Sequence, residues 1–150
     1  MPRTHDYQRA RVYRWENDTL KYLKVMFQDW PDAQKEAARI WRCSTRLDMP
    51  SLHDGRGCRR ATGSSWRVSL PTWARSNVVI THELAHALAQ RLGLCDGHGP
   101  RWAAIYLAML DAAGIKAAER GMAEARDMRV DVDAELLERR LAHNARRAAA

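Results

Sequence analysis

The segment VVITHELAHALAQRLG, residues 78–93, constrains this chain more than any other. Its apolar residues recur every four positions, which predicts an amphipathic helix with one core-facing stripe. Ser76 or Asn77 can cap the start of this helix, and Gly93 stands where a helix end favours positive φ. We therefore expect a helix that runs to about residue 92. The residues of the apolar stripe are Ile80, Leu84, Leu88 and Leu92.

Three polar residues interrupt this apolar helix. His82 and His86 lie about 200° from the stripe at roughly 100° per residue, so both imidazoles share one side, one turn apart. Histidines at i and i+4 can hold one metal ion, and the adjacent Glu83 can reach a water molecule bound to it. Burying these three groups without partners costs several kcal/mol. A bound divalent cation would remove that cost. The alternative to a metal site is a helix whose polar side chains find other partners.

A third ligand is needed, because a catalytic zinc usually has three protein ligands and one open position. The helix rises roughly 9 Å after His86, and the six residues after Gly93 reach up to about 18 Å, so His98 can return to the site. Otherwise His98 belongs to the N-cap region of the next helix. The metzincin spacing is excluded because its third histidine would stand at Leu92. The other candidate third ligands are Asp96, Asp111 and Glu119.

The rest of the chain predicts an α+β domain over residues 1–115 and a helical C-terminal extension over residues 116–150. The extension could dock on the domain, pair with a partner or fray. In WRVSL, residues 66–70, apolar and polar residues alternate as in a half-buried strand. The expected helices cover residues 6–27, 32–42, 77–92, 100–113, 116–127 and 133–148, and short antiparallel strands are expected over 50–56, 58–63 and 66–70.

Charge and cysteine content limit the partners and the compartment. The net charge is +7, and residues 1–75 hold 15 Lys/Arg against 8 Asp/Glu. Such a basic half can bind nucleic acid or an acidic protein, or be only a solvated surface. The three cysteines have no paired spacing, and the chain shows neither an apolar leader nor a membrane span, so we expect a cytoplasmic protein. An arginine cluster precedes the histidine segment: Arg56, Arg59, Arg60, Arg67 and Arg75.

The strings HELAHAL and GHGPRW resemble the SprT-like zinc metallopeptidases, whose third ligand is the histidine of an H-G-x-x-[FW] segment. Together with QRARVYRWEN and LPTWARSNVVITHELAHAL, they are also similar to small gluzincin-type metallohydrolases of high-G+C bacteria and their phages. The similarity spans roughly residues 5–110. It implies a compact zincin-like fold with N-terminal helices, a small antiparallel sheet, an active-site helix and a third-ligand helix. It also implies Zn²⁺ on His82, His86 and His98, with Glu83 as the catalytic residue.

The chain departs from the SprT-like pattern in two ways. The loop from His86 to His98 is shorter than in many members, and no cysteine follows Cys95, so a C-terminal zinc ribbon is absent. The DNA targeting that such a ribbon provides is therefore not implied for this chain.

The leading prediction is a zinc-dependent hydrolase that cleaves peptide bonds of a protein or peptide substrate. Residues 66–70 would hold the peptide as an added strand or be a core strand, and Tyr106 would stabilise an oxyanion or pack in the core. One alternative is a peptidase tethered to DNA by its basic half. Another is a non-catalytic nucleic-acid-binding module, with a structural zinc site on Cys43, Cys58, Cys95 and His98.

Overall fold

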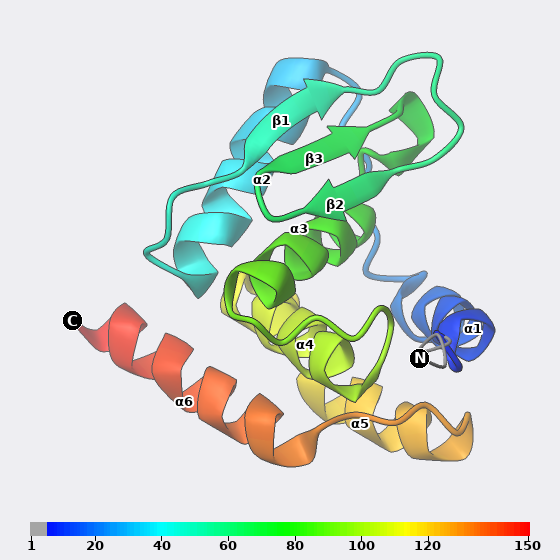
Figure 1. Ribbon diagram of the computed structural model, residues 1–150, viewed down its shortest axis with the longest axis vertical. Coiled ribbons are helices and arrows are strands. Elements are labelled where there is room, and N and C mark those ends of the chain that lie inside the picture. Colours follow the sequence, from blue (N-terminus) through cyan, green and yellow to red (C-terminus); the bar gives the residue numbers. More distant parts are fainter. Residues whose placement is uncertain (1–5) are drawn as a thin grey trace.

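The computed structural model describes residues 6–150, which form six α-helices and one three-stranded sheet (Figure 1). The expected α+β class is confirmed. None of the helices in this part of the chain is both long and apolar enough to span a membrane. The elements are α1 (Arg9–Leu20), α2 (Trp30–Ser44), β1 (Ser51–Asp54), β2 (Thr62–Ser64), β3 (Arg67–Leu70), α3 (Asn77–Arg91), α4 (Pro100–Ala112), α5 (Ala118–Asp127) and α6 (Ala134–Ala149).

The sheet is mixed, so the prediction of an antiparallel sheet was wrong. β3 is the central strand, with β1 parallel to it on one side and β2 antiparallel on the other. The reason is the segment 55–61, which carries the chain past β3 to its far side before β2 begins. A tight turn then returns the chain into β3 between its two neighbours. Only β1 and β2 have a free edge within this sheet.

Helices α3 and α4 form the centre of the molecule, between the sheet and α6 (Figure 1). The side chain of Ser76 caps α3 by accepting a hydrogen bond from the N–H of Val79 at 3.1 Å. Gly93 ends the helix with a φ of 70°, as predicted. Of the apolar stripe, the first three residues are fully buried, but Leu92 is 37% exposed. On α4, every residue from Trp102 to Leu110 is buried.

The C-terminal helix docks on the rest of the molecule. α6 packs against α4 and α2, and burial of Leu136 and Leu137 attaches its first turn to the core. Arg140 and Arg147 donate hydrogen bonds to carbonyl oxygens in the last turn of α2. Of the three possibilities for this tail, the structure therefore shows docking. The division of the chain at residue 115 remains a prediction.

The first helix is shorter than predicted, because it ends at Leu20 instead of continuing to Phe27. The residues that follow run beside the start of α3, where the side-chain amide of Asn77 bonds to the carbonyl of Leu23 and to the N–H of Val25. The N–H of Phe27 also donates to the carbonyl of Arg75 at 2.7 Å. These bonds replace those of a continued helix, and they fix α1 relative to α3.

Candidate metal centre

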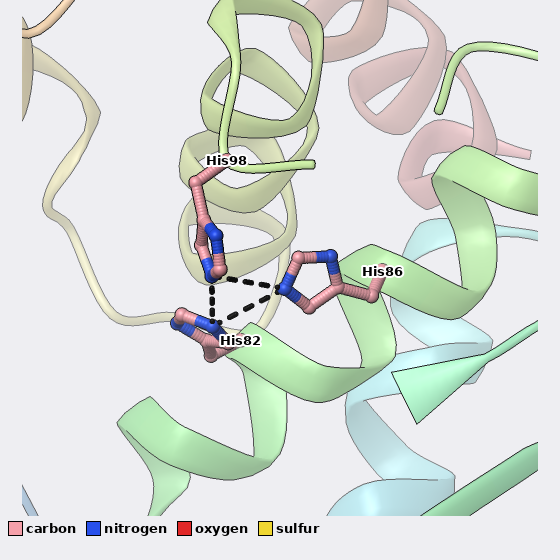
Figure 2. A group of neighbouring side chains, drawn as sticks. All are labelled: His82, His86 and His98. Atoms are coloured by element: carbon pink, nitrogen blue, oxygen red, sulfur yellow. Dashed lines mark hydrogen bonds between the residues drawn. The ribbon is translucent and has the colours of Figure 1, made fainter. Parts of the chain in front are cut away.

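Three imidazole rings from two parts of the chain meet at one point (Figure 2). His82 and His86 project from α3, and His98 comes from the loop just before α4. The Nε2 atoms are 3.3 Å apart between His82 and His86 and 3.1 Å apart between His82 and His98. Between His86 and His98 the distance is 3.2 Å. The prediction that His98 returns to the other two histidines is confirmed.

The spacing of the three nitrogens is close to that around a tetrahedral metal ion. Zinc–imidazole bonds of about 2.0–2.1 Å place two tetrahedral ligands about 3.3–3.4 Å apart. The observed distances of 3.1, 3.2 and 3.3 Å need only a small outward adjustment. Within residues 6–150, this is the one group of His, Cys, Asp or Glu side chains close enough to hold an ion.

Two carboxylates determine which nitrogen of His82 and which nitrogen of His98 faces this point. Nδ1 of His82 lies 2.7 Å from Oε2 of Glu16, and Nδ1 of His98 lies 2.5 Å from Oδ2 of Asp6. Because an ionised carboxylate only accepts, each Nδ1 carries the hydrogen, and Nε2 of the neutral ring presents a lone pair. Lone pairs that face one another repel unless a cation lies between them. The donor set therefore fits a metal ion with supporting carboxylates.

Burial and neighbouring charges set the protonation of the three rings. Burial, together with the charges of His82 and His98, lowers the pKa of His86 to about 2. Burial also lowers the pKa of His98, although Asp6 opposes the shift. Burial alone would lower the pKa of His82. The nearby carboxylates, of which Glu16 has the largest effect, outweigh burial and raise this pKa above its ordinary value. His82 is thus the ring at which protons compete most strongly with a metal ion.

Glu83 lies beside the imidazoles and is almost fully buried. Its Oε1 is 3.7 Å from Nε2 of His82, and its Oε2 has no hydrogen-bond partner among the described residues. Burial raises the pKa of Glu83 to about 7, with His82 opposing and Glu16 adding to the rise. A carboxyl group with a pKa near neutrality can accept a proton and return it. A water molecule bound to a metal ion at this point would give Oε2 of Glu83 a hydrogen-bond partner.

Trp102 forms the floor of the site and joins it to the core. Its indole ring stacks on the ring of His86, with centroids 5.2 Å apart and planes 23° apart, and lies 4.7 Å from the ring of His82. The indole ring also stacks with the ring of Tyr106, with centroids 4.9 Å apart. The three rings that meet the metal position are therefore packed against rigid aromatic groups of α4.

The alternative third ligands have other places in the structure. The carboxylate of Asp96 accepts hydrogen bonds from the backbone N–H groups of Arg101 and Trp102, at 2.8 and 3.0 Å, and so caps the start of α4. Asp111 and Glu119 are exposed. None of the three belongs to the group that can hold an ion.

The N-terminal segment supplies supporting residues that the sequence analysis missed. The N–H of His98 donates to Asp6, and its carbonyl accepts from the side chain of Gln8 at 2.8 Å. Gln8 is fully buried and also bonds to the backbone of Asp131. A signal was present, because Tyr13 and Glu16 follow Arg9 at i+4 and i+7 and so share one helix face. That face of α1 is turned toward the histidines.

The structure decides between alternatives that the sequence left open for two other groups near the site. The cysteines do not join His98: Cys58 and Cys95 are exposed, Cys43 is half-buried, and no cysteine of the described chain belongs to the group that can hold an ion. Tyr106 is fully buried in the core, where its hydroxyl donates to the carbonyl of Val78 at 3.3 Å. It is therefore not available to stabilise an oxyanion.

The basic surface is less uniform than the sequence indicates. Arg75 is buried, paired with Asp54 and stacked over the ring of Trp30 at 4.8 Å. Arg56, Arg59 and Arg60 are exposed in the segment between β1 and β2. Binding of nucleic acid by the basic half remains a prediction.

No protein-family model, curated protein or solved structure matches this chain. The geometry of the site is therefore the basis for assigning a function.

Proposed function

We propose that this protein is a zinc-dependent hydrolase that cleaves peptide bonds, and that it belongs with the SprT-like, zincin-type metallopeptidases. The observation that carries the proposal is the convergence of three Nε2 atoms within 3.3 Å of one another beside a buried carboxylate, one oxygen of which has no hydrogen-bond partner within residues 6–150. A purely structural metal site would have four protein ligands and no need for Glu83. Three ligands plus an adjacent carboxylate favour a catalytic site.

In this proposal His82, His86 and His98 hold the zinc ion, and Glu83 moves the proton. When held there, a zinc ion would supply a water molecule with a pKa lowered toward 7 and would polarise the carbonyl of the scissile bond. Glu83 takes the proton from the attacking water and then gives it to the leaving amine. Burial suits Glu83 to both roles, because it raises the pKa of the carboxyl to about 7, where the group can accept a proton and return it.

The substrate-holding element is β2 instead of the predicted segment 66–70. β3 has neighbours on both sides and cannot accept another strand, whereas β2 lies at an edge of the sheet. β2 also lies directly over the active-site helix, since a Cβ on Gly63 would come within 2.1 Å of the carbonyl oxygen of Glu83. An extended peptide paired with the free edge of β2 would pass close to the histidines.

Tyr13 replaces Tyr106 as the proposed donor to the developing oxyanion. Its ring lies 5.2 Å from that of His98, and the side chain is 42% exposed. Nε of Arg9 donates to the hydroxyl oxygen of Tyr13 at 3.1 Å, and this leaves the hydroxyl hydrogen of Tyr13 free for a substrate oxygen.

The test compares two variants of the zinc-loaded protein on a mixed set of fluorogenic peptides. Glu83→Gln should retain one zinc per chain and lose hydrolysis by at least about 100-fold, because the proton acceptor is gone. His82→Ala should lose both zinc and hydrolysis. Full activity of Glu83→Gln would refute the mechanism, and an inactive native protein that holds one zinc would refute the assignment as a peptidase.

A further inference from the structure

A cavity of about 230 Å³ opens beside the metal centre, and His82 and Glu83 form part of its wall. Three arginines from two separate elements also line it. Arg9 comes from α1, on the same helix face as Tyr13 and Glu16, while Arg59 and Arg60 come from the segment between β1 and β2. The cavity therefore places basic side chains around the position where a substrate would meet Glu83.

These guanidinium groups have no acidic partner in the described chain. The ion pairs of residues 6–150 involve other arginines, namely Arg39, Arg75, Arg101 and Arg120. Among the described residues that line the cavity, the carboxylates are those of Glu83 and Glu16, and Glu16 is already bonded to His82. Positive charge at the cavity is thus left for a ligand to neutralise.

Aromatic residues of the same wall hold the side chain of Arg9 and the backbone of Arg59. The indole N–H of Trp73 donates to the carbonyl of Arg59 at 3.0 Å, which anchors the segment between β1 and β2. Nε of Arg9 donates to the hydroxyl oxygen of Tyr13. Because a fixed donor loses less entropy on binding than a free surface side chain, Arg9 suits recognition of an anion, and Arg59 and Arg60 extend toward it from an anchored segment.

We propose that the site selects substrates that carry a carboxylate next to the scissile bond, so that the enzyme cleaves acidic peptides. This inference rests on the proposed function, because it takes the cavity to be the substrate site of the metal centre. Arginine binds carboxylates through paired, charge-assisted hydrogen bonds, and the cavity has room for one side chain. The carboxylate could belong to an Asp or Glu side chain or to the C-terminus of the substrate.

The experiment uses the zinc-loaded full chain and sets of peptides that differ only in one residue beside the cleavable bond. Glu, Gln and Lys are compared at each flanking position, and each peptide is made with a free or an amidated C-terminus. We expect a kcat/KM about 10-fold or more higher for Glu than for Gln at one position, in line with a charge-assisted hydrogen bond. A gain that follows the free C-terminus instead would assign the carboxylate to the chain end.

Variants show whether the arginines cause the preference. Arg59→Ala and Arg60→Ala should each reduce the ratio of Glu to Gln peptides, and Arg60→Glu should shift preference toward the Lys peptide. Arg67→Ala is the matched control: it removes the same charge from an exposed position on β3 outside the cavity and should leave the ratio unchanged. An equal ratio in all variants would overturn the inference.

Peptide binding separates failure of this inference from failure of the proposed function. Affinities of the same fluorescent peptides for zinc-loaded Glu83→Gln are measured by anisotropy. If native protein cleaves Glu and Gln peptides equally and Glu83→Gln binds them equally, acidic selection is wrong while the peptidase assignment stands. If no peptide is cleaved, the peptidase assignment is wrong, and the anisotropy series alone decides whether the arginine-lined cavity selects carboxylates.

Discussion

The substitution Glu16→Gln tests whether the metal centre depends on its supporting carboxylates. Oε2 of Glu16 accepts from Nδ1 of His82 at 2.7 Å, and both side chains are largely buried, with 14% and 7% of their surface exposed. In Gln, the amide oxygen can still accept this hydrogen bond, but the negative charge is lost. The change therefore removes the electrostatic support of the ligand while keeping its orientation.

The expected magnitude follows from this geometry. Loss of a supporting partner of a metal-bound histidine typically lowers metal affinity by 10- to 100-fold, or about 1.4–2.7 kcal/mol. Glu16→Gln should lie near the lower end, at about 10-fold, because the hydrogen bond remains. Glu16→Ala removes both charge and hydrogen bond and should approach 100-fold.

Zinc affinity is measured by competition with a chromophoric chelator at pH 8. This pH is chosen because Glu16 also raises the pKa of His82, so at lower pH its removal would weaken competition by protons and mask part of the loss. Glu138→Gln, an identical change at an exposed position of α6, is the control and should bind zinc like the native protein. If Glu16→Gln and Glu16→Ala both matched this control, the carboxylate would have no part in holding the metal.

Three further predictions concern the strand, the oxyanion donor and pH. Gly63→Ala should destabilise the protein by about 1–3 kcal/mol in urea unfolding, because the new Cβ would collide with the backbone of Glu83. Thr62→Ala, at the exposed neighbouring position, should not destabilise it, and equal stability of the two variants would refute the close approach of β2 to α3. Tyr13→Phe should retain zinc and lower kcat by about 10-fold or more, and an unchanged kcat would remove Tyr13 from the mechanism. Burial lowers the pKa of His86 in the folded protein to about 2, below its ordinary value of 6.5. Its contribution to the free energy of unfolding of the zinc-free protein is therefore fully present above pH 6.5 and decreases as the pH falls, by about 2 kcal/mol at pH 5. His86→Asn should make the free energy of unfolding less dependent on pH between pH 5 and pH 6.5. A pH dependence identical to that of the native protein would contradict a lowered pKa for His86.

The pairing of His82 with His86 could be predicted from the sequence because it depends on local periodicity. A helix with its apolar stripe on one side must present His82 and His86 together on the other. The length of its loop allowed His98 to return to them, and the structure places His98 there in preference to the alternative third ligands. These inferences needed only helix geometry and chain reach, which tertiary packing did not change.

The supporting residues were missed because they depend on long-range packing. Asp6 lies 92 residues from His98 along the chain, and Glu16 lies 66 residues from His82. The helical pattern of residues 6–27 continued past Leu20, but tertiary hydrogen bonds to α3 ended the helix there. A sequence pattern that describes each element alone cannot show which face of α1 meets α3.

The order of strands was also beyond local analysis. Alternation in residues 66–70 correctly placed Val68 and Leu70 in the core, but it does not specify neighbours. Trp66 fitted the same alternation, yet it is 58% exposed, with the guanidinium of Arg91 3.6 Å from its ring centroid. The parallel pairing of β1 with β3 arises from the path of residues 55–61 around the sheet.

X-ray absorption spectroscopy of the zinc-loaded protein tests the central claim most directly. We predict one zinc per chain, with three imidazole nitrogens at about 2.0–2.1 Å and one further oxygen ligand. Sulfur scattering at about 2.3 Å, or a shell with fewer than three imidazoles, would contradict a metal site built from His82, His86 and His98.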